Sequence, residues 1–580
     1  MNRLKPIIIN ELRPIFEKLG IDENHWHPLI QTSRESSQGD LTLPCFPLAK
    51  IVGKNPLEIA NSIATEFPSV ASIQQCNAVN GYVNFRASNV WMFEQLPSCT
   101  DSMLEKKQIL IEHTSANPNG PFHVGRARNA ILGDTLVRLH RLAGNEVTAE
   151  YYVDDMGKQV AVLAWALEHL TKEEVDSILA DKEADSGQWE GKTDHQSVRW
   201  YQAAQSLRQS SERKDSIEEE ITTLVHASEH GNSEVLRQFE NAYQPVLDGM
   251  LETLQRLGIQ FDRFTKESTF VINGDVATLI DTLKKSELHG EAENGALFLD
   301  LEPRGLTGKT EFFYCRGDGS SLYATRDIAY HLWKWAQSEN LVNVLGEDHK
   351  LQAKQVGLTL QELNSKAPEI VFYSFIKLPE GKMSTRKGNV VFMDDLLEEA
   401  HGHAAQVVQE LRPEYSHEEI STIAEAVGTS AVRFNIIKVS PEKGFTFKWE
   451  DALAFEAGSA PFVMYAHTRA CSIKEKVESS KKPSTFEIED FTNLPEGCEQ
   501  LLRALMLFSD QLDTSVMENR PHIFANYLLQ LATSYHAFYR DCHVLEGNEV
   551  NTTYYAISEF AKNALRKGLV GLGITPLESM

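Results

Sequence analysis

The segment Glu112–Gly125, which reads EHTSANPNGPFHVG, constrains the fold more than any other part of this chain. It follows Ile109–Ile111, an apolar run typical of a buried strand, and it contains a turn rich in Asn, Pro and Gly. Apolar side chains then recur at helical spacing, at Ile131, Leu132, Leu136, Leu139 and Leu142. The pattern predicts an α/β domain with a strand, a tight turn and a helix that begins near His123.

A helix start of this kind is suited to binding phosphate. The N–H groups of the first turn and the positive end of the helix dipole both face an anion placed there. His123 and Arg126 would add hydrogen-bond donors to phosphate oxygens. Gly125 has no side chain, so a base or ribose could lie directly on the backbone. The alternative is an ordinary strand-to-helix turn of an α/β domain.

A second segment, KMSTRKGN at Lys382–Asn389, follows another expected strand at Ile370–Leu378. Three cations, Lys382, Arg386 and Lys387, stand among hydroxyl groups beside a glycine. Such a cationic loop is suited to holding a pyrophosphate that leaves with developing negative charge. The alternative is a solvated basic loop.

The two segments resemble the two signatures of class I aminoacyl-tRNA synthetases. HVGR at His123–Arg126 is similar to the His-Ile-Gly-His signature, and KMSTRKG is similar to the Lys-Met-Ser-Lys-Ser loop. EHTSANPNGPFHVGRARN and three further segments resemble arginyl-tRNA synthetases specifically: YYVDDMGKQ at Tyr151–Gln159, LYATRD at Leu322–Asp327 and YAHTRACSI at Tyr465–Ile473. The resemblance covers essentially the whole chain.

Two positions depart from the signatures. Arg126 stands in place of the second signature histidine, which retains a donor for phosphate and adds a permanent charge. Thr385 replaces the later lysine of the loop, although Lys387 lies two residues on. One cation is therefore kept on each side of the expected phosphate site.

The resemblance implies three domains. A class I catalytic domain with a doubly wound parallel, Rossmann-like sheet would span 105–410, with a helical insertion at about 157–265. An α+β domain at 1–104 would contact the tRNA, and an all-α bundle at 411–580 would bind the anticodon. Strand signals at Ala296–Asp300, Glu311–Cys315 and Leu341–Leu345 alternate with helical ones and favour a parallel sheet. From about Pro413 onward, the apolar spacing is fully helical.

The resemblance also implies a reaction. The chain would activate L-arginine with ATP to arginyl-adenylate and pyrophosphate, then transfer arginine to the terminal adenosine of its tRNA. Mg²⁺ would accompany ATP, held by phosphates and water rather than by a protein cage. Carried over residue by residue, catalysis falls to His123, Gly125, Arg126, Lys382, Ser384 and Lys387, and ATP contacts to Pro121, His123, Gly125, Arg126, Lys382 and Met383.

Three alternatives share part of this pattern: a class I synthetase of another specificity, a related small-molecule adenylyltransferase, and a catalytically inactive RNA-binding paralogue. The adenylyltransferase would have no use for a helical C-terminal domain. The inactive paralogue would have lost His123, Gly125 or Lys382, and this chain keeps all three.

A guanidinium is planar and always charged, with five N–H donors, so its pocket requires fixed carboxylates. Glu112 and Asp327 match the family positions that hold the substrate side chain, and Tyr323 matches a further pocket position. Asn117 and His349 match positions that hold the α-amino end, although the alignment slips near His349. Asp327 has a local alternative, as a cap or a partner of Arg326.

Contacts with tRNA are expected in both end domains. Asn84 and Phe85 could pair with and stack on a looped-out base, or they could be ordinary strand residues. Tyr465 and Arg469 combine an aromatic ring with a cation, which suits base stacking. Other basic candidates are Arg433, Lys438, Lys443, Lys448, Lys474, Lys476, Arg540, Arg566 and Lys567.

The net charge of -26 opposes binding of a polyanion, so tRNA contacts must use local basic patches. The seven cysteines are scattered without a CxxC pair, which favours a reducing compartment and argues against a zinc site. No signal peptide or apolar span is apparent, and no metal ligand set is expected. The family resemblance suggests a cytoplasmic monomer.

Overall fold

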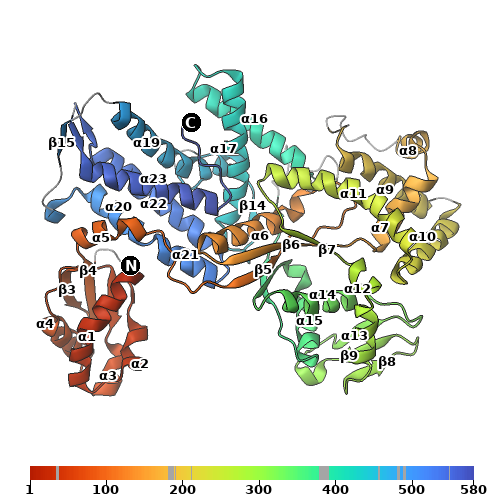
Figure 1. The fold of residues 1–580 in the computed structure, drawn as a ribbon, viewed down its shortest axis with the longest axis horizontal. Helices are drawn as coiled ribbons and strands as arrows, with labels where there is room; N and C mark the ends of the chain where they lie inside the picture. The colour runs from red at the N-terminus through yellow and green to blue at the C-terminus, as the bar shows by residue number, and fades with distance from the viewer. Residues whose placement is uncertain are drawn as a thin grey trace.

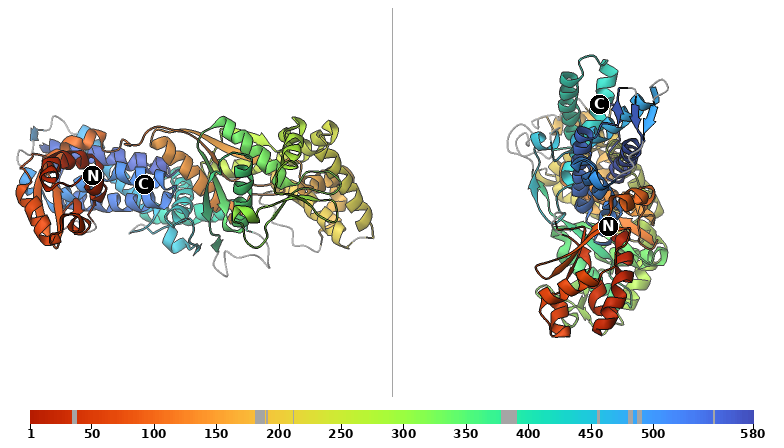
Figure 2. Two further views of the ribbon diagram at one scale, coloured as in Figure 1. Left: turned by 90° about the horizontal axis from the view of Figure 1, so that it is seen from below. Right: turned by 90° about the vertical axis from the view of Figure 1, so that its left-hand side faces the viewer.

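The computed structural model describes residues 1–580 except 34–37, 181–188, 190, 211, 378–390, 455–456, 480–483, 487–490 and 548. The molecule is elongated, with the N-terminal domain and the C-terminal helices at one end, a parallel sheet in the middle and the helical insertion at the other end (Figures 1 and 2). Among the described helices, none combines the length and apolar character that a membrane span requires.

The centre is a five-stranded parallel sheet in the order β12–β11–β5–β6–β7. The chain runs outward from β5 through β6 to β7, and later crosses to the other side of β5 for β11 and β12. The strand order therefore reverses between β5 and β11, which is where open α/β sheets bind ligands. The expected parallel sheet is confirmed. Its strands are β5 (Gln108–Glu112), β6 (Glu146–Val153), β7 (Arg263–Lys266), β11 (Leu341–Gly346) and β12 (Glu369–Tyr373).

Helices cover both faces of this sheet. Helix α6 (Val124–Leu142) packs Leu132 and Leu136 on the apolar residues of β5, β11 and β12. Helices α14 (Tyr323–Gln337) and α15 (Lys350–Glu362) belong to a separate core, against which Tyr152 of β6 packs. Successive side chains of a strand point to opposite faces of the sheet, so each face packs against a different hydrophobic core.

The expected insertion is helical and lies between β6 and β7 (Figure 1). It consists of α7 (Lys158–His169), α8 (Lys172–Ile178), α9 (Thr193–Ser210), α10 (Lys214–Glu229) and α11 (Ser233–Arg256). Two short helices, α12 (Ser268–Ile272) and α13 (Asp275–Leu283), follow β7. After them comes a second sheet, formed by β8 (His289–Glu291), β9 (Leu297–Asp300) and β10 (Glu311–Cys315).

The assignment of β9 and β10 to the parallel sheet is wrong. Both strands were expected from the sequence, but with β8 they form a separate antiparallel sheet in the order β10–β9–β8. The link between β9 and β10 contains only the 3₁₀ turn Glu302–Arg304. A parallel pair needs a crossover of about a dozen residues or more, whereas a short link allows only an antiparallel pair.

The N-terminal domain packs α1 (Lys5–Leu19) and α4 (Pro56–Glu66) on an antiparallel sheet in the order β1–β2–β4–β3. A buried ion pair, Arg503 to Asp40 at 2.6 Å, ties this domain to the C-terminal helices. The remaining elements are α2 (Glu23–Trp26), α3 (Phe46–Val52), α5 (Asn89–Gln95), β1 (Gln31–Thr32), β2 (Leu41–Pro44), β3 (Ile73–Val79) and β4 (Tyr82–Ala87).

Asn84 and Phe85, expected to contact a tRNA base, lie inside this domain. Phe85 is 0% exposed, and its ring centre lies 5.2 Å from that of Phe67. Asn84 is buried and accepts a hydrogen bond from Thr42 Oγ1 at 2.7 Å. Neither side chain offers a base a free face, because the two point to opposite faces of the sheet and both are buried. The structure supports the alternative, that both are ordinary strand residues.

The C-terminal region is helical, as expected. Its helices are α16 (Met393–Leu411), α17 (His417–Ile437), α18 (Trp449–Ala452), α19 (Ala460–Ser479), α20 (Glu496–Met506), α21 (Phe508–Met517), α22 (Pro521–Asp541) and α23 (Thr552–Gly571). This region also contains short strands that the helical spacing did not predict, because a strand of two or three residues is too short to show a periodic pattern. Strand β14 (Phe445–Thr446) pairs with β13 (Ile376–Lys377). A separate small sheet is formed by β15 (Ser484–Phe486), β16 (Leu545–Glu546) and β17 (Glu549–Asn551).

Arg433, considered above as a basic tRNA contact, is buried instead. Its guanidinium donates to Asp134 Oδ2 at 2.6 Å and to the backbone oxygens of Leu257 and Leu572. Asp134 lies on α6, so the carboxylate that neutralises Arg433 comes from another domain and is not apparent in the local sequence. Arg433 joins domains rather than facing the solvent.

Candidate active site

The HVGR segment forms the start of α6, next to the point where the strand order reverses. His123 is the residue before the helix, with extended backbone angles, and no described side chain caps the helix start. Val124 N donates to Val391 O at 3.0 Å, and Met393 N donates to Phe122 O at 2.7 Å. The chain that emerges from the KMSTRKGN segment is thus hydrogen-bonded to the HVGR segment. Four predicted site residues, Lys382, Met383, Ser384 and Lys387, lie outside the described residues.

Gly125 allows the His123 ring to lie on the helix backbone. A Cβ at position 125 would lie 3.0 Å from His123 Nδ1 and 3.1 Å from Cε1, closer than side chains normally pack. Burial, together with the charge of Arg126, lowers the pKa of His123 to about 4. His123 is therefore a neutral imidazole near pH 7, and the permanent charge at this helix start belongs to Arg126.

Arg126 is half-buried, and Pro121 is buried beside it. Burial lowers the pKa of the Arg126 guanidinium from its usual value. Its Nη1 donates to the backbone oxygen of Asn117 at 3.4 Å. The Asn117 amide in turn donates to Asp154 Oδ2 at 3.0 Å and to Gln159 Oε1 at 3.2 Å. Arg126 and Asn117 are therefore neighbours, and Asn117 faces the YYVDDMGKQ segment.

A strained turn links Glu112 to this region. Thr114 and Ser115 both have left-handed backbone angles, with φ of 69° and 38°. Such angles are uncommon outside glycine, especially for a β-branched residue, and cost about 1–3 kcal/mol. Asn129 of α6 compensates: its side chain accepts from Thr114 N at 2.7 Å and donates to Val344 O at 3.0 Å. Sequence analysis missed this turn, because no glycine marks it.

A pocket opens at the carboxyl ends of β5 and β11. Three of the five residues predicted to hold arginine line it: Glu112, Asp327 and His349. Three further polar residues line it as well and were missed: His331, Asn343 and Gln352. Glu112 and Asn343 stand opposite each other in the register of β5 and β11. The pocket therefore occupies the switch point of the sheet, between two strands and the helices α14 and α15.

Asp327 is a carboxylate of this pocket rather than only a helix residue. Burial raises the pKa of its carboxyl, but the neighbouring His331 and then Lys334 outweigh burial and hold the pKa below its usual value. Asp327 is therefore ionised near pH 7, as recognition of a guanidinium requires. Its alternative partner Arg326 pairs instead with Glu267, at 2.5 Å.

Tyr323 lies outside the lining of this pocket. It is the first residue of α14 and its side chain is 63% exposed. It stands four residues before Asp327, and residues with that spacing share one face of a helix. Tyr323 is thus on the same side of α14 as Asp327, one turn closer to the solvent.

The two C-terminal candidates for tRNA contact meet in one cluster. The Arg469 guanidinium lies 4.4 Å from the ring centre of Tyr465 and 4.8 Å from that of Tyr539. Its Nη1 lies 3.1 Å from Nδ1 of His536. Tyr539 is 38% exposed, so this cluster of α19 and α22, termed the Arg469 cluster below, reaches the surface.

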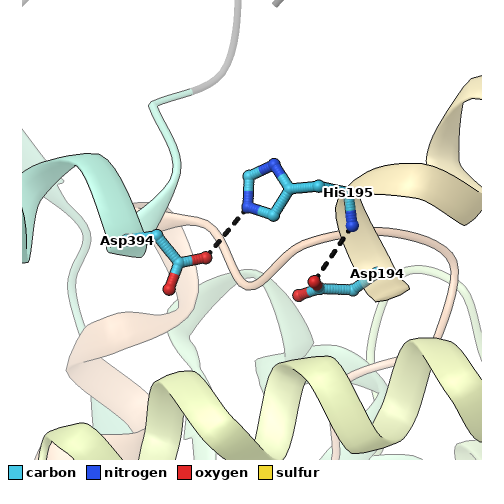
Figure 3. Close-up of side chains that lie close together, drawn as sticks. All are labelled: Asp194, His195 and Asp394. Carbon is cyan, nitrogen blue, oxygen red and sulfur yellow. Dashed lines mark hydrogen bonds and ion pairs between the residues drawn. The ribbon is translucent and has the colours of Figure 1, made fainter. Parts of the chain in front are cut away.

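Asp194, His195 and Asp394 are the one group of potential metal ligands found among the described residues (Figure 3). His195 Nε2 lies 2.9 Å from Asp394 Oδ2. Lys192, which Figure 3 does not draw, places its Nζ 3.1 Å from Asp194 Oδ2 and 2.7 Å from Asp394 Oδ2. An ammonium group therefore already supplies the positive charge that a cation would bring. The cluster joins α9 of the insertion to the start of α16, and the expected lack of a protein-caged metal stays a prediction.

Three family profiles match the chain in order. The Arginyl tRNA synthetase N terminal domain matches residues 2–87, the catalytic domain of tRNA synthetases class I (R) matches 94–449, and the DALR anticodon binding domain matches 463–580. The catalytic profile alone covers more than half of the chain. It extends past the domain boundary expected at residue 410.

Curated relatives and solved structures agree with these profiles. An arginine–tRNA ligase of Methanocella arvoryzae is 41% identical over 559 residues, which cover 94% of this chain and 95% of the relative. One of Methanothermobacter thermautotrophicus is 38% identical, with 93% of each chain covered. The arginyl-tRNA synthetase of Thermus thermophilus superimposes with a TM-score of 0.79 at 25% identity, over 100% of both chains. With the HVGR helix start and the two-carboxylate pocket in place, the chain belongs to the arginyl-tRNA synthetase family of class I aminoacyl-tRNA synthetases.

Proposed function

We propose that this chain is an arginine–tRNA ligase. It activates L-arginine with ATP to arginyl-adenylate and pyrophosphate, and then transfers arginine to the terminal adenosine of an arginine-accepting tRNA. The observation that carries the proposal is the pocket at the switch point, where Glu112 and Asp327 face a space between β5, β11, α14 and α15. A guanidinium can pair with fixed carboxylates on more than one edge, and few other amino-acid side chains could.

In the first step, the arginine carboxylate attacks the α-phosphorus of ATP and pyrophosphate leaves. The start of α6 and Arg126 supply positive potential for the phosphates, and the neutral His123 ring supplies a hydrogen bond. Lys382, Ser384 and Lys387 are assigned to the leaving pyrophosphate, by family match alone. Mg²⁺ enters with ATP and is held mainly by phosphate oxygens and water. Pro121 and Met383 are assigned to contacts with ATP, by family match alone.

For arginine itself, Glu112 and Asp327 are assigned to binding of the guanidinium group. Tyr323 is assigned to a further position of the same pocket, by family match. Asn117 and His349 are assigned to the α-amino end. The assignment of His349 is supported by its position, because it lines the same pocket as Glu112 and Asp327. Asn117 is supported less directly, through its neighbour Arg126 at the start of α6.

In the second step, a hydroxyl of the terminal ribose, by family analogy the 2′-hydroxyl, attacks the carbonyl carbon of arginyl-adenylate, and AMP leaves. The Arg469 cluster, with Tyr465 and Tyr539, offers ring faces and a cation to unpaired bases. Such a local patch is needed because a net charge of -26 repels the tRNA backbone. We extend the proposal to a monomer that acts in the cytoplasm.

The test is aminoacylation with ATP, Mg²⁺ and total tRNA, comparing arginine with lysine, cysteine and glutamate. Charging by arginine alone is expected. Charging by another amino acid would point to a class I synthetase of a different specificity. A lack of charging, combined with ATP–pyrophosphate exchange in the absence of tRNA, would point to a small-molecule adenylyltransferase. In the ligase, arginine-dependent exchange is expected to require tRNA.

A further inference from the structure

A buried cation lies next to Glu112, outside the residues that line the pocket. Lys334, on α14, is 0% exposed, and its Nζ lies 2.6 Å from Glu112 Oε2 and 3.1 Å from Asn343 Oδ1. The ammonium also lies 4.3 Å from the ring centre of Tyr330. Burying an ammonium is costly unless a carboxylate and hydrogen-bond acceptors compensate for the lost water. Lys334 and Glu112 therefore stabilise each other's charge inside the fold.

Glu112 is held from both sides by these contacts. Its Oε2 accepts from Lys334, and its Oε1 accepts from Ser115 Oγ at 3.1 Å. The Ser115 hydroxyl is itself held in place, because it accepts a hydrogen bond from Tyr152 N at 3.1 Å. Each carboxylate oxygen keeps a second lone pair for a ligand. The carboxylate is thus fixed in orientation before any substrate arrives.

The same network reaches the second carboxylate through His331. Two donors face His331 Nε2, the Asn343 amide at 2.8 Å and Lys334 Nζ at 3.3 Å. Nε2 must therefore accept a hydrogen bond, and the N–H group of the ring is then at Nδ1. Nδ1 faces Asp327, 2.8 Å from its backbone oxygen and 3.1 Å from Oδ1. A continuous polar chain runs from Glu112 through Lys334 and His331 to Asp327.

The charges of this network match a single positive substrate group. Glu112 and Asp327 place two carboxylates at the pocket, whereas Lys334 places one ammonium beside Glu112. Glu150, behind Glu112, is already paired with Arg263 at 2.5 Å. The pocket therefore has one more carboxylate than fixed ammonium groups, and a guanidinium brings one positive charge.

We propose that Lys334 is a positioning residue for arginine, which fixes the Glu112 carboxylate and offsets one of the two negative charges in the pocket. The inference rests on the proposed function, since it assigns Lys334 a part in recognition of arginine. Because Lys334 acts through Glu112, its effect must depend on Glu112 being present. Two residues that act through one contact are not additive when both are changed.

The experiment is a double-mutant cycle of Lys334→Met and Glu112→Gln, with steady-state aminoacylation of purified full-length protein. Lys334→Met alone is expected to raise the KM for arginine about tenfold or more, which is the effect of losing a charged hydrogen bond. The KM for ATP is expected to stay unchanged. In the Glu112→Gln background, Lys334→Met is expected to add no further rise, because the carboxylate it positions is gone.

Lys366→Met is the matched control. Lys366 is exposed, and its Nζ lies 5.9 Å from the ring centre of Trp335 on α14. The variant therefore removes a lysine near the same helix without changing a residue that lines the pocket. Lys334→Gln keeps a donor for Glu112 without the charge, and it replaces Lys334→Met in the cycle if the latter fails to fold.

Two results would overturn the inference: an unchanged KM for arginine, or an equal rise in both backgrounds. A parallel rise in the KM for ATP would also overturn it, since that is the mark of a general structural defect. Failure of the wild-type protein to charge arginine would instead reject the proposed function. The two failures are therefore distinguishable in one set of assays.

Discussion

Arg433 and Asp134 form a buried ion pair, 2.6 Å apart, between the C-terminal helix α17 and the helix that begins at the HVGR segment. Arg433 also donates to Leu572 O, close to the end of the chain. Gly573 has a left-handed φ of 71°, and a Cβ there would lie 2.1 Å from Arg433 Nη2. One guanidinium thus holds α6 against the C-terminal region, and a glycine makes the space for it.

Removing Arg433 should destabilise the protein strongly. Arg433→Met leaves the Asp134 carboxylate buried, with Arg138, at 2.7 Å, as its one remaining cationic partner among the described residues. Breaking a buried ion pair from one side typically costs about 3–5 kcal/mol. We expect a clear loss of unfolding free energy in urea titration. Arg304→Met, which removes the largely exposed partner of Glu362, is the control and should cost about 1 kcal/mol or less. Equal losses in the two variants would contradict this account.

Gly125→Ala should abolish most activity without unfolding the protein. The new Cβ would lie 3.0 Å from His123 Nδ1, so the ring must shift by a few tenths of an ångström from its place over the helix start. Loss of one preorganised hydrogen bond at such a site typically lowers kcat about 100- to 1,000-fold. Single-turnover adenylate formation measures this effect. Gly402→Ala, on α16 with no described atom within 4 Å of the new Cβ, should retain full activity. Wild-type rates for Gly125→Ala would show that the His123 position is unimportant.

Stability should fall as the pH is lowered from 6.5 towards 4. Burial lowers the pKa of both His113 and His123 from 6.5 to about 4. Between these values the unfolded histidines bind protons and the folded ones do not, so acid favours unfolding. Their contribution to stability is fully present above pH 6.5 and is lost as the pH falls towards 4. Thermal unfolding over this range measures it, and His113→Asn should flatten the dependence. A midpoint that does not change with pH would be inconsistent with these shifts.

Arg469→Ala should weaken tRNA binding selectively. It removes the cation that lies between Tyr465 and Tyr539, and stacking contacts with bases are typically worth about 1–3 kcal/mol. We expect the KM for tRNA to rise about tenfold while the KM for arginine stays unchanged. Arg520→Met, which removes an exposed cation just before α22 that pairs with Glu442, serves as the control. Similar effects of both variants would mean that net charge, rather than the cluster, governs binding.

Local patterns were enough to predict the centre of the fold. The apolar run before Glu112 and the helical spacing after His123 predict β5 and α6, because both signals lie within one stretch of sequence. Glu112 and Asp327 were expected in one pocket, and the structure brings them together with His349. That expectation depended on the family resemblance, since nothing in the sequence places α14 beside β5.

The remaining features depend on contacts between distant segments. Lys334 stands among the aromatic residues of α14 and resembles an ordinary charged helix residue, until β5 places Glu112 2.6 Å from it. Arg433 likewise resembles a basic surface residue in the sequence, because its partner Asp134 is distant along the chain. The left-handed turn at Thr114 and Ser115 has no glycine to announce it, and it persists because Asn129 of α6 holds it.

The central claim is that the pocket carboxylates recognise the guanidinium of arginine. The most direct measurement is the KM for arginine of Asp327→Asn, which keeps the shape of the side chain and removes its charge. Loss of one charged partner should cost about 2 kcal/mol or more, which corresponds to a rise in KM of about thirtyfold or more. The KM for ATP should stay at the wild-type value. An arginine KM equal to that of the wild type would contradict the account.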